Sequence, residues 1–247
     1  MGDYGKLLPA LYELDRVNGW SIGMRAVTHA LLAQVALPPG PILELGAGSG
    51  LFNAQLQRRF ADRLVTGVDL HPLALAYARL AGPEPPRLLR GDLQQLPLGA
   101  TTVSAILALD TFDQLGVDVD RALAESWRVL QPGGLLLLRV SAHPWLEGAH
   151  DMAFNTGRRF RRSELVAALV ARGFCVERVT YANALLSPPL VLLRLLERWG
   201  WLNLPETTLA DSPANRLFAA LLGLEARWLA YGNFGFGISL YTLATKP

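Results

Sequence analysis

The chain has 247 residues, of which 51% are hydrophobic and 18% charged, and its net charge is only +2 at pH 7. This length suits one α/β domain with an insertion and is enough to bury a full core. The small net charge gives no support for a nucleic-acid partner, whose phosphates are bound by clustered basic side chains. The single cysteine, Cys175, excludes an internal disulfide, fits a reducing compartment and is expected in the core.

The expected compartment follows from two absences in the sequence. The first residues lack the basic start and the continuous apolar run of a signal peptide. No uncharged apolar stretch is long enough to cross a bilayer. We therefore expect a cytoplasmic protein without a transmembrane segment.

Short apolar runs alternate with helical patterns along the chain, which is typical of a doubly wound α/β fold with a mostly parallel sheet. The expected strands are residues 42–45, 64–69, 87–90, 103–109, 135–140, 174–181 and 236–245. The expected helices are residues 21–37, 51–60, 72–80, 120–130, 163–172, 189–199 and 213–231, with Ser163 as an N-cap. Residues 131–134, Gln-Pro-Gly-Gly, should separate the helix at 120–130 from the fifth strand.

A glycine-rich turn follows the first expected strand. Residues 46–50 read Gly-Ala-Gly-Ser-Gly, and Asp69 ends the second expected strand. Glycines permit positive φ and let a ligand contact bare backbone, and the helix that follows adds unpaired N–H groups and a positive dipole end. A carboxylate at this spacing could bind a ribose diol. The pattern fits a dinucleotide (although Leu51 replaces its last glycine), another adenosine cofactor, or an ordinary tight turn.

Glu44 lies two residues before this turn, and residues 44–50 resemble motif I of the class I S-adenosylmethionine-dependent methyltransferases. The resemblance is to the bacterial small-molecule type with a methyltransferase-11-like domain. Residues 130–134, Leu-Gln-Pro-Gly-Gly, resemble the turn before the fifth strand in that family. The resemblance implies a Rossmann-like three-layer sandwich with a seven-stranded, mostly parallel sheet. Its last strand is then antiparallel and lies between the fifth and the sixth.

The same resemblance implies one methyltransferase domain over residues 1–247, with an N-terminal helical cap at 1–37 and a helical insertion at 182–235 between strands six and seven. The helices expected in that insertion are rich in apolar side chains. Their apolar surface could cover a pocket for a lipophilic acceptor, form a homodimer interface, or make peripheral contact with a membrane. The sequence leaves these three alternatives open.

The resemblance implies S-adenosylmethionine as the cofactor. The backbone of the glycine turn would line its methionine and ribose, Glu44 would orient the turn or the methionyl ammonium, and Asp69 would accept the ribose hydroxyls. Asp92 and Leu93 would meet the adenine, and Leu109 would approach the methionyl part. The expected cofactor-binding residues are Glu44, Gly46, Ala47, Gly48, Gly50, Asp69, Leu70, Asp92, Leu93 and Leu109.

The acceptor chemistry is expected in the segments that follow the fourth and fifth strands. A hydroxyl acceptor benefits from a general base, and His150 is the favoured catalytic residue, with Asp113 or Asp151 as its partner. Arg158 belongs to a basic cluster that could bind a carboxylate or phosphate, or remain solvated. The histidines lack a paired metal-ligand spacing, so no metal is expected. The expected substrate-contacting residues are Trp20, Phe112, His143, Trp145 and Arg158.

These features favour an enzyme that transfers a methyl group to a small, lipophilic or glycosylated metabolite, by O-methylation before N-methylation. The segment after the fourth strand lacks the Asn/Asp-Pro-Pro-Tyr/Phe motif of enzymes that methylate planar amino nitrogens, which argues against nucleobase acceptors. Bacterial members of the resembled group act near glycan, lipid and natural-product pathways. The alternatives are an enzyme of the same fold with non-methylating chemistry such as cyclisation, and a non-catalytic protein that binds S-adenosylmethionine.

Overall fold

The computed structural model describes residues 4–79, 85–198 and 213–247. Its strands are β1 Ile42–Leu45, β2 Val65–Asp69, β3 Leu88–Arg90, β4 Val103–Leu109, β5 Leu130–Ser141, β6 Cys175–Ala182 and β7 Ser239–Thr245. Its helices are α1 Tyr4–Val17, α2 Gly19–Leu32, α3 Leu51–Arg59, α4 Pro72–Arg79, α5 Val119–Val129, α6 Ala149–Ala153, α7 Arg162–Ala171, α8 Ser187–Arg198 and α9 Pro213–Leu229, with a short 3-10 helix, η1, at Pro144–Leu146. The expected alternation of strands and helices is confirmed.

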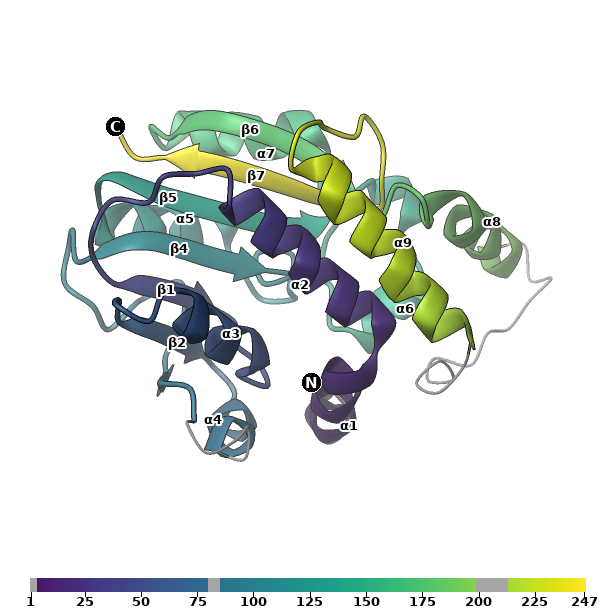
Figure 1. Cartoon of the computed structure of the whole chain (residues 1–247), viewed down its shortest axis with the longest axis horizontal. Helices are drawn as coiled ribbons and strands as arrows, with labels where there is room; N and C mark the ends of the chain where they lie inside the picture. Colours follow the sequence, from purple (N-terminus) through teal and green to yellow (C-terminus); the bar gives the residue numbers. More distant parts are fainter. Residues whose placement is uncertain (1–3, 80–84, 199–212) are drawn as a thin grey trace. The chain divides into compact units, whose positions relative to one another are not determined.

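The strands of the described chain form one seven-stranded sheet in the order β3-β2-β1-β4-β5-β7-β6 (Figure 1). The first five of these are joined by parallel pairing. β7 runs antiparallel to β5. The N–H of Gly133, early in β5, donates to the carbonyl of Lys246, just after β7, at 2.7 Å. The N–H of Ala142, just after β5, donates to Ile238, just before β7, at 3.0 Å. The expected sheet, with an antiparallel last strand between the fifth and sixth, is confirmed.

The central strands are buried because both of their faces are covered. All four residues of β1 are buried, and so are the first six of β4. Strands covered on both faces read as continuous apolar runs and not as alternating patterns. For this reason the expected limits of β1 and β4 coincide with the observed ones.

The chain divides into two compact units. The sheet unit contains residues 37–140, 162–179 and 241–247, and with them most of the sheet and helices α3, α4, α5 and α7. The helical unit contains residues 1–36, 141–161 and 180–240, and with them α1, α2, α6, α8 and α9. β5, β6 and β7 each pass from one unit to the other along the chain. The division into an N-terminal cap, one domain and an insertion stays a prediction.

Within the helical unit, α2 packs along α9 (Figure 1). A Cβ on Gly23 would lie 2.3 Å from the Cβ of Leu222, so glycine lets the two helices approach closely. The side chain of Asn215 bridges the junction of α1 and α2. It accepts the N–H of Gly19 and donates to the carbonyl of Val17 at 2.8 Å. The N-terminal helices are therefore fixed to the last helix of the expected insertion.

Two expectations about helix ends are wrong. α2 begins at Gly19 with Asn18 as its N-cap, and it ends at Leu32 instead of residue 37. The N–H of Ala33 still bonds four residues back, to His29, whereas those of Gln34 and Val35 bond only three residues back, to Leu31 and Leu32, and the helix ends. α7 begins at Arg162, so Ser163 lies inside the first turn and does not cap the helix. A separate helix, α1, precedes α2 and was not distinguished in the sequence pattern.

Residues 131–134 do not separate α5 from the fifth strand, as the sequence had suggested. β5 already begins at Leu130, which pairs with Val103 of β4. The next paired residue is Leu135, opposite Ala105. Four residues of β5, 131–134, therefore lie opposite one residue of β4, Ser104, and the Pro-Gly-Gly segment forms an irregular bulge within the strand.

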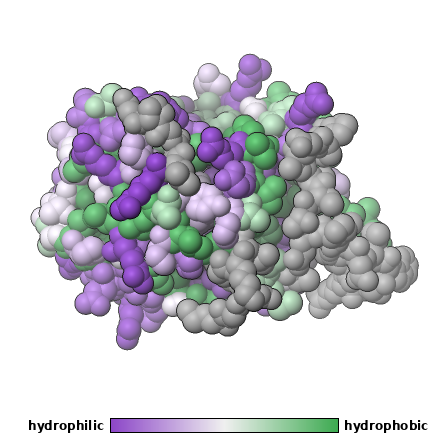
Figure 2. Space-filling model, turned by 90° about the horizontal axis from the view of Figure 1, so that it is seen from below, coloured by the Kyte–Doolittle hydropathy of each residue, from purple (hydrophilic) through white to green (hydrophobic). Residues whose placement is uncertain are grey.

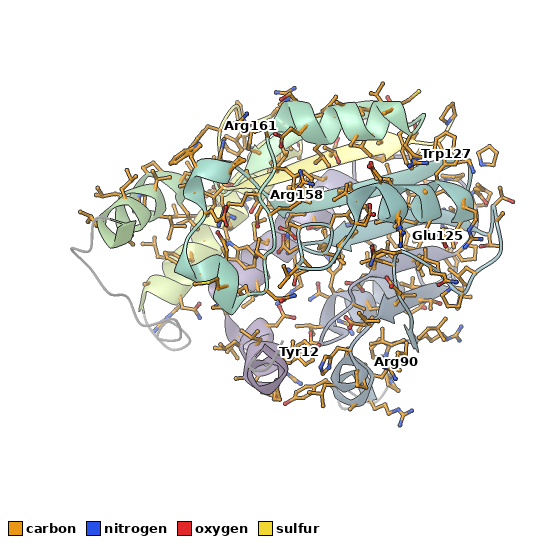
Figure 3. All side chains as sticks on the ribbon, turned by 180° about the vertical axis from the view of Figure 1, so that it is seen from behind. Tyr12, Arg90, Glu125, Trp127, Arg158 and Arg161 are labelled. Atoms are coloured by element: carbon orange, nitrogen blue, oxygen red, sulfur yellow. The ribbon has the colours of Figure 1, made fainter. Side chains whose placement is uncertain are left out.

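Cys175 was expected in the core, and that expectation is wrong because the side chain is exposed. Successive side chains near the start of β6 point to opposite faces. Phe174 takes the inner side, where its ring packs edge-on against Trp127 with ring centroids 4.9 Å apart (Figure 3). Cys175 therefore points outward.

The described surface mixes residue types. Figure 2 shows hydrophilic and hydrophobic residues interspersed over one face of the protein. Among the helices that the structure describes, none combines the length and the apolar character required to cross a bilayer.

Candidate functional site

The glycine turn joins β1 to α3 in the sheet unit. Gly46, Gly48 and Gly50 have φ values of 69°, 51° and 74°, in the left-handed region that favours glycine. A Cβ on Gly46 would lie 2.4 Å from the hydroxyl oxygen of Thr111. One on Gly50 would lie 2.7 Å from a ring carbon of Pro86. The turn therefore needs glycine for its backbone and for its space, and it leads directly into α3.

Asp69 ends β2, and its carboxylate contacts the glycine turn. One oxygen accepts the N–H of Gly48 at 2.9 Å, and the other accepts the N–H of His71 at 2.8 Å. A carboxylate offers about four lone-pair sites, so each oxygen can accept one further donor. Burial raises the pKa of Asp69, while the two backbone N–H groups and the charge of His71 oppose that rise. The arrangement leaves acceptor capacity for a ligand diol.

The segment that follows β3 is held by α5. The Asp92 carboxylate accepts the N–H of Gln94 at 2.8 Å, which forms a local turn. Farther along, the N–H of Leu96 donates to Glu125 at 2.8 Å, and Arg128 donates to the carbonyl of Leu96 at 3.1 Å. Arg128 also binds Glu125 through two N–H groups, each at 2.7 Å, and this bond holds the pKa of Glu125 below its usual range. Sequence reasoning missed this clamp, because its partners lie about thirty residues apart.

The predicted cofactor residues at the ends of β1 and β4 are tied together. The hydroxyl of Thr111 donates to the carbonyls of Leu45 and Leu109, at 3.1 and 3.0 Å. Glu44 is buried, with 4% of its surface exposed. Phe112 and Asp113, which were expected to meet substrate and to assist catalysis, are both fully buried. Their assigned roles stay predictions.

A buried ion pair fixes the loop after β4. Arg139 of β5 binds the carboxylate of Asp110 through two N–H groups, at 2.8 and 2.6 Å. It also donates to the hydroxyl of Tyr241 at 3.4 Å. Burial opposes the charge on Arg139, but Asp110 and Tyr241 outweigh burial and hold its pKa above the usual range. The pair was also missed in the sequence, where neither residue belongs to a recognisable motif.

The residues of the sheet unit fit S-adenosylmethionine. Thr111 and Pro86 occupy the space that a Cβ on Gly46 or Gly50 would need, so only glycine fits this turn. Asp69 retains acceptor capacity for a ribose. Next to it, Leu70 is 61% exposed and offers an apolar surface for a flat base. Asp92 and Leu93 are partly exposed in the clamped segment. The site roles assigned to these residues stay predictions.

The candidate acceptor residues lie in the helical unit. Asp151 and Arg159 form a buried pair through two hydrogen bonds, at 2.5 and 2.8 Å, and Arg159 also donates to the carbonyl of Ala142 at 3.1 Å. His150, the predicted base, is exposed on α6, where its ring packs on Phe154 with centroids 4.2 Å apart. Asp151 thus binds Arg159, and its partnership with His150 stays a prediction.

Three other predicted substrate residues are exposed to different degrees. Arg158 is exposed and lies over the ring of Phe160, 4.3 Å from its centroid (Figure 3). Trp20 is half-buried in the first turn of α2, where its N–H donates to Asn18 at 2.8 Å. Trp145 is 47% exposed and packs against His143. Their contacts with a substrate stay predictions, as does the absence of a metal.

Residues 43–138 match a family model described as a methyltransferase domain. A malonyl-[acyl-carrier protein] O-methyltransferase of Geobacter sulfurreducens is 32% identical over 162 residues, which are 59% of this chain and 59% of that protein. The chain spans about half the length of the curated relatives it matches. The family model covers the glycine turn, Asp69 and the clamped segment.

Solved structures agree at the level of the fold. A chain from the complex between the Haloferax volcanii Trm112 methyltransferase activator and a methyltransferase superposes with a TM-score of 0.65 at 19% identity, covering 100% of this chain and 99% of that one. The [4+2]-cyclase SpnF has a TM-score of 0.60 at 21% identity, covering 90% of this chain and 80% of its own.

The fold, the glycine turn and the family match together define a class. Residues 43–138 match the methyltransferase domain family, and the relatives and the shared fold support a class I S-adenosylmethionine-dependent methyltransferase. S-adenosylmethionine is the cofactor of that class.

Proposed function

We propose that this protein transfers a methyl group from S-adenosylmethionine to a hydroxyl group of a small, lipophilic or glycosylated metabolite. The observation that carries the proposal is the contact between Asp69 and Gly48. It joins the acid at the end of β2 to the glycine turn after β1 and leaves acceptor capacity on both carboxylate oxygens. The similarity to an O-methyltransferase supports oxygen as the acceptor atom before nitrogen.

The predicted cofactor-binding residues of the sheet unit each have a role in this proposal. Asp69 binds the ribose hydroxyls, and the glycine turn admits the methionyl part. Glu44 orients the turn or the methionyl ammonium. Asp92 and Leu93 bind the adenine edge. When bound, the cofactor supplies an electrophilic methyl group, so the protein contributes mainly by positioning the acceptor and accepting its proton.

Exposed apolar side chains support a lipophilic acceptor or an apolar partner. On α9, Leu217, Leu224 and Trp228 are each more than half exposed, and their spacing of seven and four places them on one helical face. Such a face could contact the acceptor, a second copy of the chain or a membrane surface. A cytoplasmic location and a role in natural-product biosynthesis belong to the same proposal.

The test separates donor binding from transfer. Isothermal titration of the protein with S-adenosylmethionine should give saturable binding, and its absence at high micromolar concentration would contradict the proposal. The protein is then incubated with the cofactor and a panel of phenols, sugars, fatty acids and amines, and S-adenosylhomocysteine is measured by mass spectrometry. Formation of S-adenosylhomocysteine with a hydroxyl compound is the expected result.

A second candidate function is non-methylating chemistry such as cyclisation, with the cofactor bound but unconsumed. The chain shares its fold with a [4+2]-cyclase, so the same experiment also tests this alternative. It predicts tight cofactor binding together with no S-adenosylhomocysteine from any acceptor. Binding without transfer across the whole panel would therefore favour it over methylation.

A further inference from the structure

Helix α9 carries large apolar side chains on two opposite sides. Its inner side is buried, and there Leu222 approaches Gly23 of α2. On the opposite side lie three apolar side chains that are each more than half exposed, Leu217, Leu224 and Trp228. A helix that is apolar on both sides is normally covered on both. The outer side of α9 is therefore a candidate interaction surface.

The exposed side chains form one row along α9. At about 100° per residue, positions 217, 224 and 228 lie within about 40° of one another around the helix axis and span about 17 Å along it. Tyr231 follows the helix in a turn that its N–H closes on the carbonyl of Trp228 at 2.9 Å, and its side chain is 94% exposed. We refer to Leu217, Leu224, Trp228 and Tyr231 as the outer row.

The exposed charges beside the outer row are positive. The charged residues of Pro213–Leu229 are Arg216, Glu225 and Arg227. Both arginines are exposed, and the helical period places them on the same flank of the row. Glu225 is instead fully buried, and its carboxylate accepts the N–H of Leu185 at 2.7 Å. Over its described length, the exposed side of α9 thus carries apolar and cationic groups and no acid.

The neighbouring helix α2 supplies no acid either. The only arginine, lysine or acid within Gly19–Leu32 is Arg25, which is buried and binds Asp15 at 2.7 Å. The exposed residues of this helix are Ile22 and Ala26. Neither of the two described helices therefore presents an exposed carboxylate, and a partner of this surface has to supply the negative charge itself.

Charge decides between two apolar partners, a second copy of the chain and a lipid bilayer. A symmetric contact between two copies joins the same patch to itself. It would bring Arg216 and Arg227 of one copy near those of the other, and like charges at an interface disfavour association. A bilayer with anionic lipids supplies both an apolar interior and negative phosphates. Each arginine near such a surface strengthens binding about fivefold, equivalent to about 1 kcal/mol.

The residue types of the outer row also suit the boundary between lipid and water. Trp and Tyr rings are enriched at this boundary because one end of the ring is apolar and the other can hydrogen-bond. Trp228 lies in the last turn of α9, and Tyr231 follows it. An amphipathic helix of this kind lies in the plane of the interface with its apolar side toward the acyl chains. α9 can adopt that orientation while its inner side stays packed on α2.

We propose that the outer row of α9 binds the surface of an anionic lipid bilayer. Leu217, Leu224 and Trp228 enter the region of the upper acyl chains, and Arg216 and Arg227 bind lipid phosphates. The contact is peripheral and involves the helical unit alone. It goes beyond the proposed methyl transfer and does not depend on it.

The first experiment measures binding to vesicles of stated composition. The protein is sedimented with vesicles of phosphatidylcholine alone, and with vesicles in which about one quarter of the lipid is phosphatidylglycerol. At about 0.1 M salt, binding to the anionic vesicles should be at least about tenfold stronger than to the neutral ones. At about 1 M salt, where the Debye length is about 3 Å, this difference should disappear. Absence of wild-type binding to the anionic vesicles would overturn the proposal.

Paired substitutions in α9 test both parts of the contact. Leu217→Gln with Leu224→Gln removes half of the outer row and should weaken binding to the anionic vesicles at least about tenfold. Arg216→Gln with Arg227→Gln should weaken it about 25-fold, the product of two fivefold effects. Binding that neither pair of substitutions weakens would show that α9 does not contact the bilayer.

Matched controls lie in the sheet unit. Val170→Gln replaces an apolar residue of α7 that is 57% exposed, similar to the leucines of the outer row. Arg58→Gln with Arg121→Gln removes two exposed arginines, so it changes the net charge by the same amount as the substitutions in α9. Both controls should bind like the wild type. Equal losses in the controls and in the α9 variants would mean that binding follows net charge alone, which contradicts the proposal.

A fluorescence measurement locates the contact without weakening it. Brominated phosphatidylcholine in the anionic vesicles quenches tryptophans that reach the upper acyl chains. Trp228→Phe keeps an apolar ring in the outer row, so it should bind like the wild type while losing much of the quenching. Unchanged quenching would place the contact elsewhere and refute the assignment to α9. This measurement decides the question even if far-UV circular dichroism shows that a paired variant is unfolded.

Sedimentation velocity without lipid tests the other occupant. The wild type and Leu217→Gln with Leu224→Gln should have the same sedimentation coefficient. A wild-type dimer that these substitutions convert into a monomer would assign the outer row to a second copy of the chain and overturn the proposal. Isothermal titration of the same proteins with S-adenosylhomocysteine keeps this proposal apart from the proposed function, because failure to bind the cofactor product leaves the expected vesicle binding unchanged.

Discussion

Replacement of Asp69 by Asn tests the assignment of the cofactor site most directly. In the structure each oxygen of Asp69 accepts one backbone N–H, from Gly48 at 2.9 Å and from His71 at 2.8 Å. Asparagine keeps one of these acceptors and turns the other into an NH₂ group, which would face a second donor. It also loses the capacity to accept two ribose hydroxyls. Both changes act against a bound nucleoside.

The expected loss of cofactor affinity in Asp69→Asn is about 1–3 kcal/mol, the cost of leaving buried polar groups unpaired. This corresponds to an increase in Kd of about 5- to 150-fold. The assay is isothermal titration with S-adenosylhomocysteine at pH 8. Asp62→Asn is the matched control, because Asp62 is an exposed acid in the same unit. It should bind like the wild type.

The pH dependence adds a second measurement. Because burial raises the pKa of Asp69, its carboxylate takes up a proton at a higher pH than an ordinary aspartate. Ribose binding needs the ionised form, so the affinity of the wild type should fall as the pH falls through this raised pKa. Asp69→Asn should show no such limb. An unchanged Kd for Asp69→Asn at pH 8, or an identical acidic limb in both proteins, would refute the assignment of the ribose.

Three further predictions concern the framework of the sheet unit. Gly46→Ala should destabilise the fold by about 2–4 kcal/mol in urea unfolding, because position 46 combines a positive φ with a close contact to Thr111. Gly133 also has a positive φ but has open space around it, so Gly133→Ala should cost only about 1 kcal/mol. Equal losses in the two variants would contradict the packing argument. Asp110→Asn leaves the buried charge of Arg139 without its partner carboxylate. Because Asp110 is one-third exposed, the loss of unfolding free energy should stay below the about 3–5 kcal/mol of a fully buried pair. An unchanged urea midpoint would show that the pair does not stabilise the fold. Arg128→Met removes the hydrogen bonds to the carbonyls of Leu96 and Leu98 and should release the segment after Asp92. The Kd for S-adenosylhomocysteine should then rise about five- to tenfold, equivalent to about 1–1.4 kcal/mol. Tighter binding would contradict the role of the clamp.

The sequence predicted the parts of the fold that depend on local patterns. The limits of β1 and β4 were predicted because buried parallel strands are continuous apolar runs. The glycine turn was predicted because left-handed backbone selects glycine wherever the chain must turn without room for a Cβ. The antiparallel β7 came from the family resemblance and not from any local signal in that strand.

What the sequence did not predict depends on contacts between distant residues. Glu125 and Arg128 look like an ordinary exposed pair on a helix, and only the fold brings them to the backbone of Leu96. Gly23 looks like a weak point in a helix, and only the approach of Leu222 explains it. Similarly, the rings that stack on His143 could not be predicted, because Phe236 lies almost a hundred positions away in the sequence.

The positions of backbone strain connect these findings. β1 ends at Leu45 and is followed by Gly46 with φ 69°, and β4 ends at Leu109 and is followed by Asp110 with φ 51°. His143 and Asn183 likewise have positive φ values of 62° and 58°, within two residues of the ends of β5 and β6. Asp, His and Asn are the residue types that tolerate this conformation best after glycine.

Such strain costs stability and persists where the surrounding structure enforces it, most often at ligand sites. In open α/β sheets, ligands bind beyond the carboxyl ends of the strands. Of the remaining non-glycine residues with positive φ in the described ranges, Thr101 precedes β4 and Asn155 follows α6. Strain at strand ends therefore marks, by one physical criterion, both the glycine turn that is predicted to bind the cofactor and His143, which is predicted to contact the substrate. That criterion is independent of the family match, which ends at residue 138 and does not include His143.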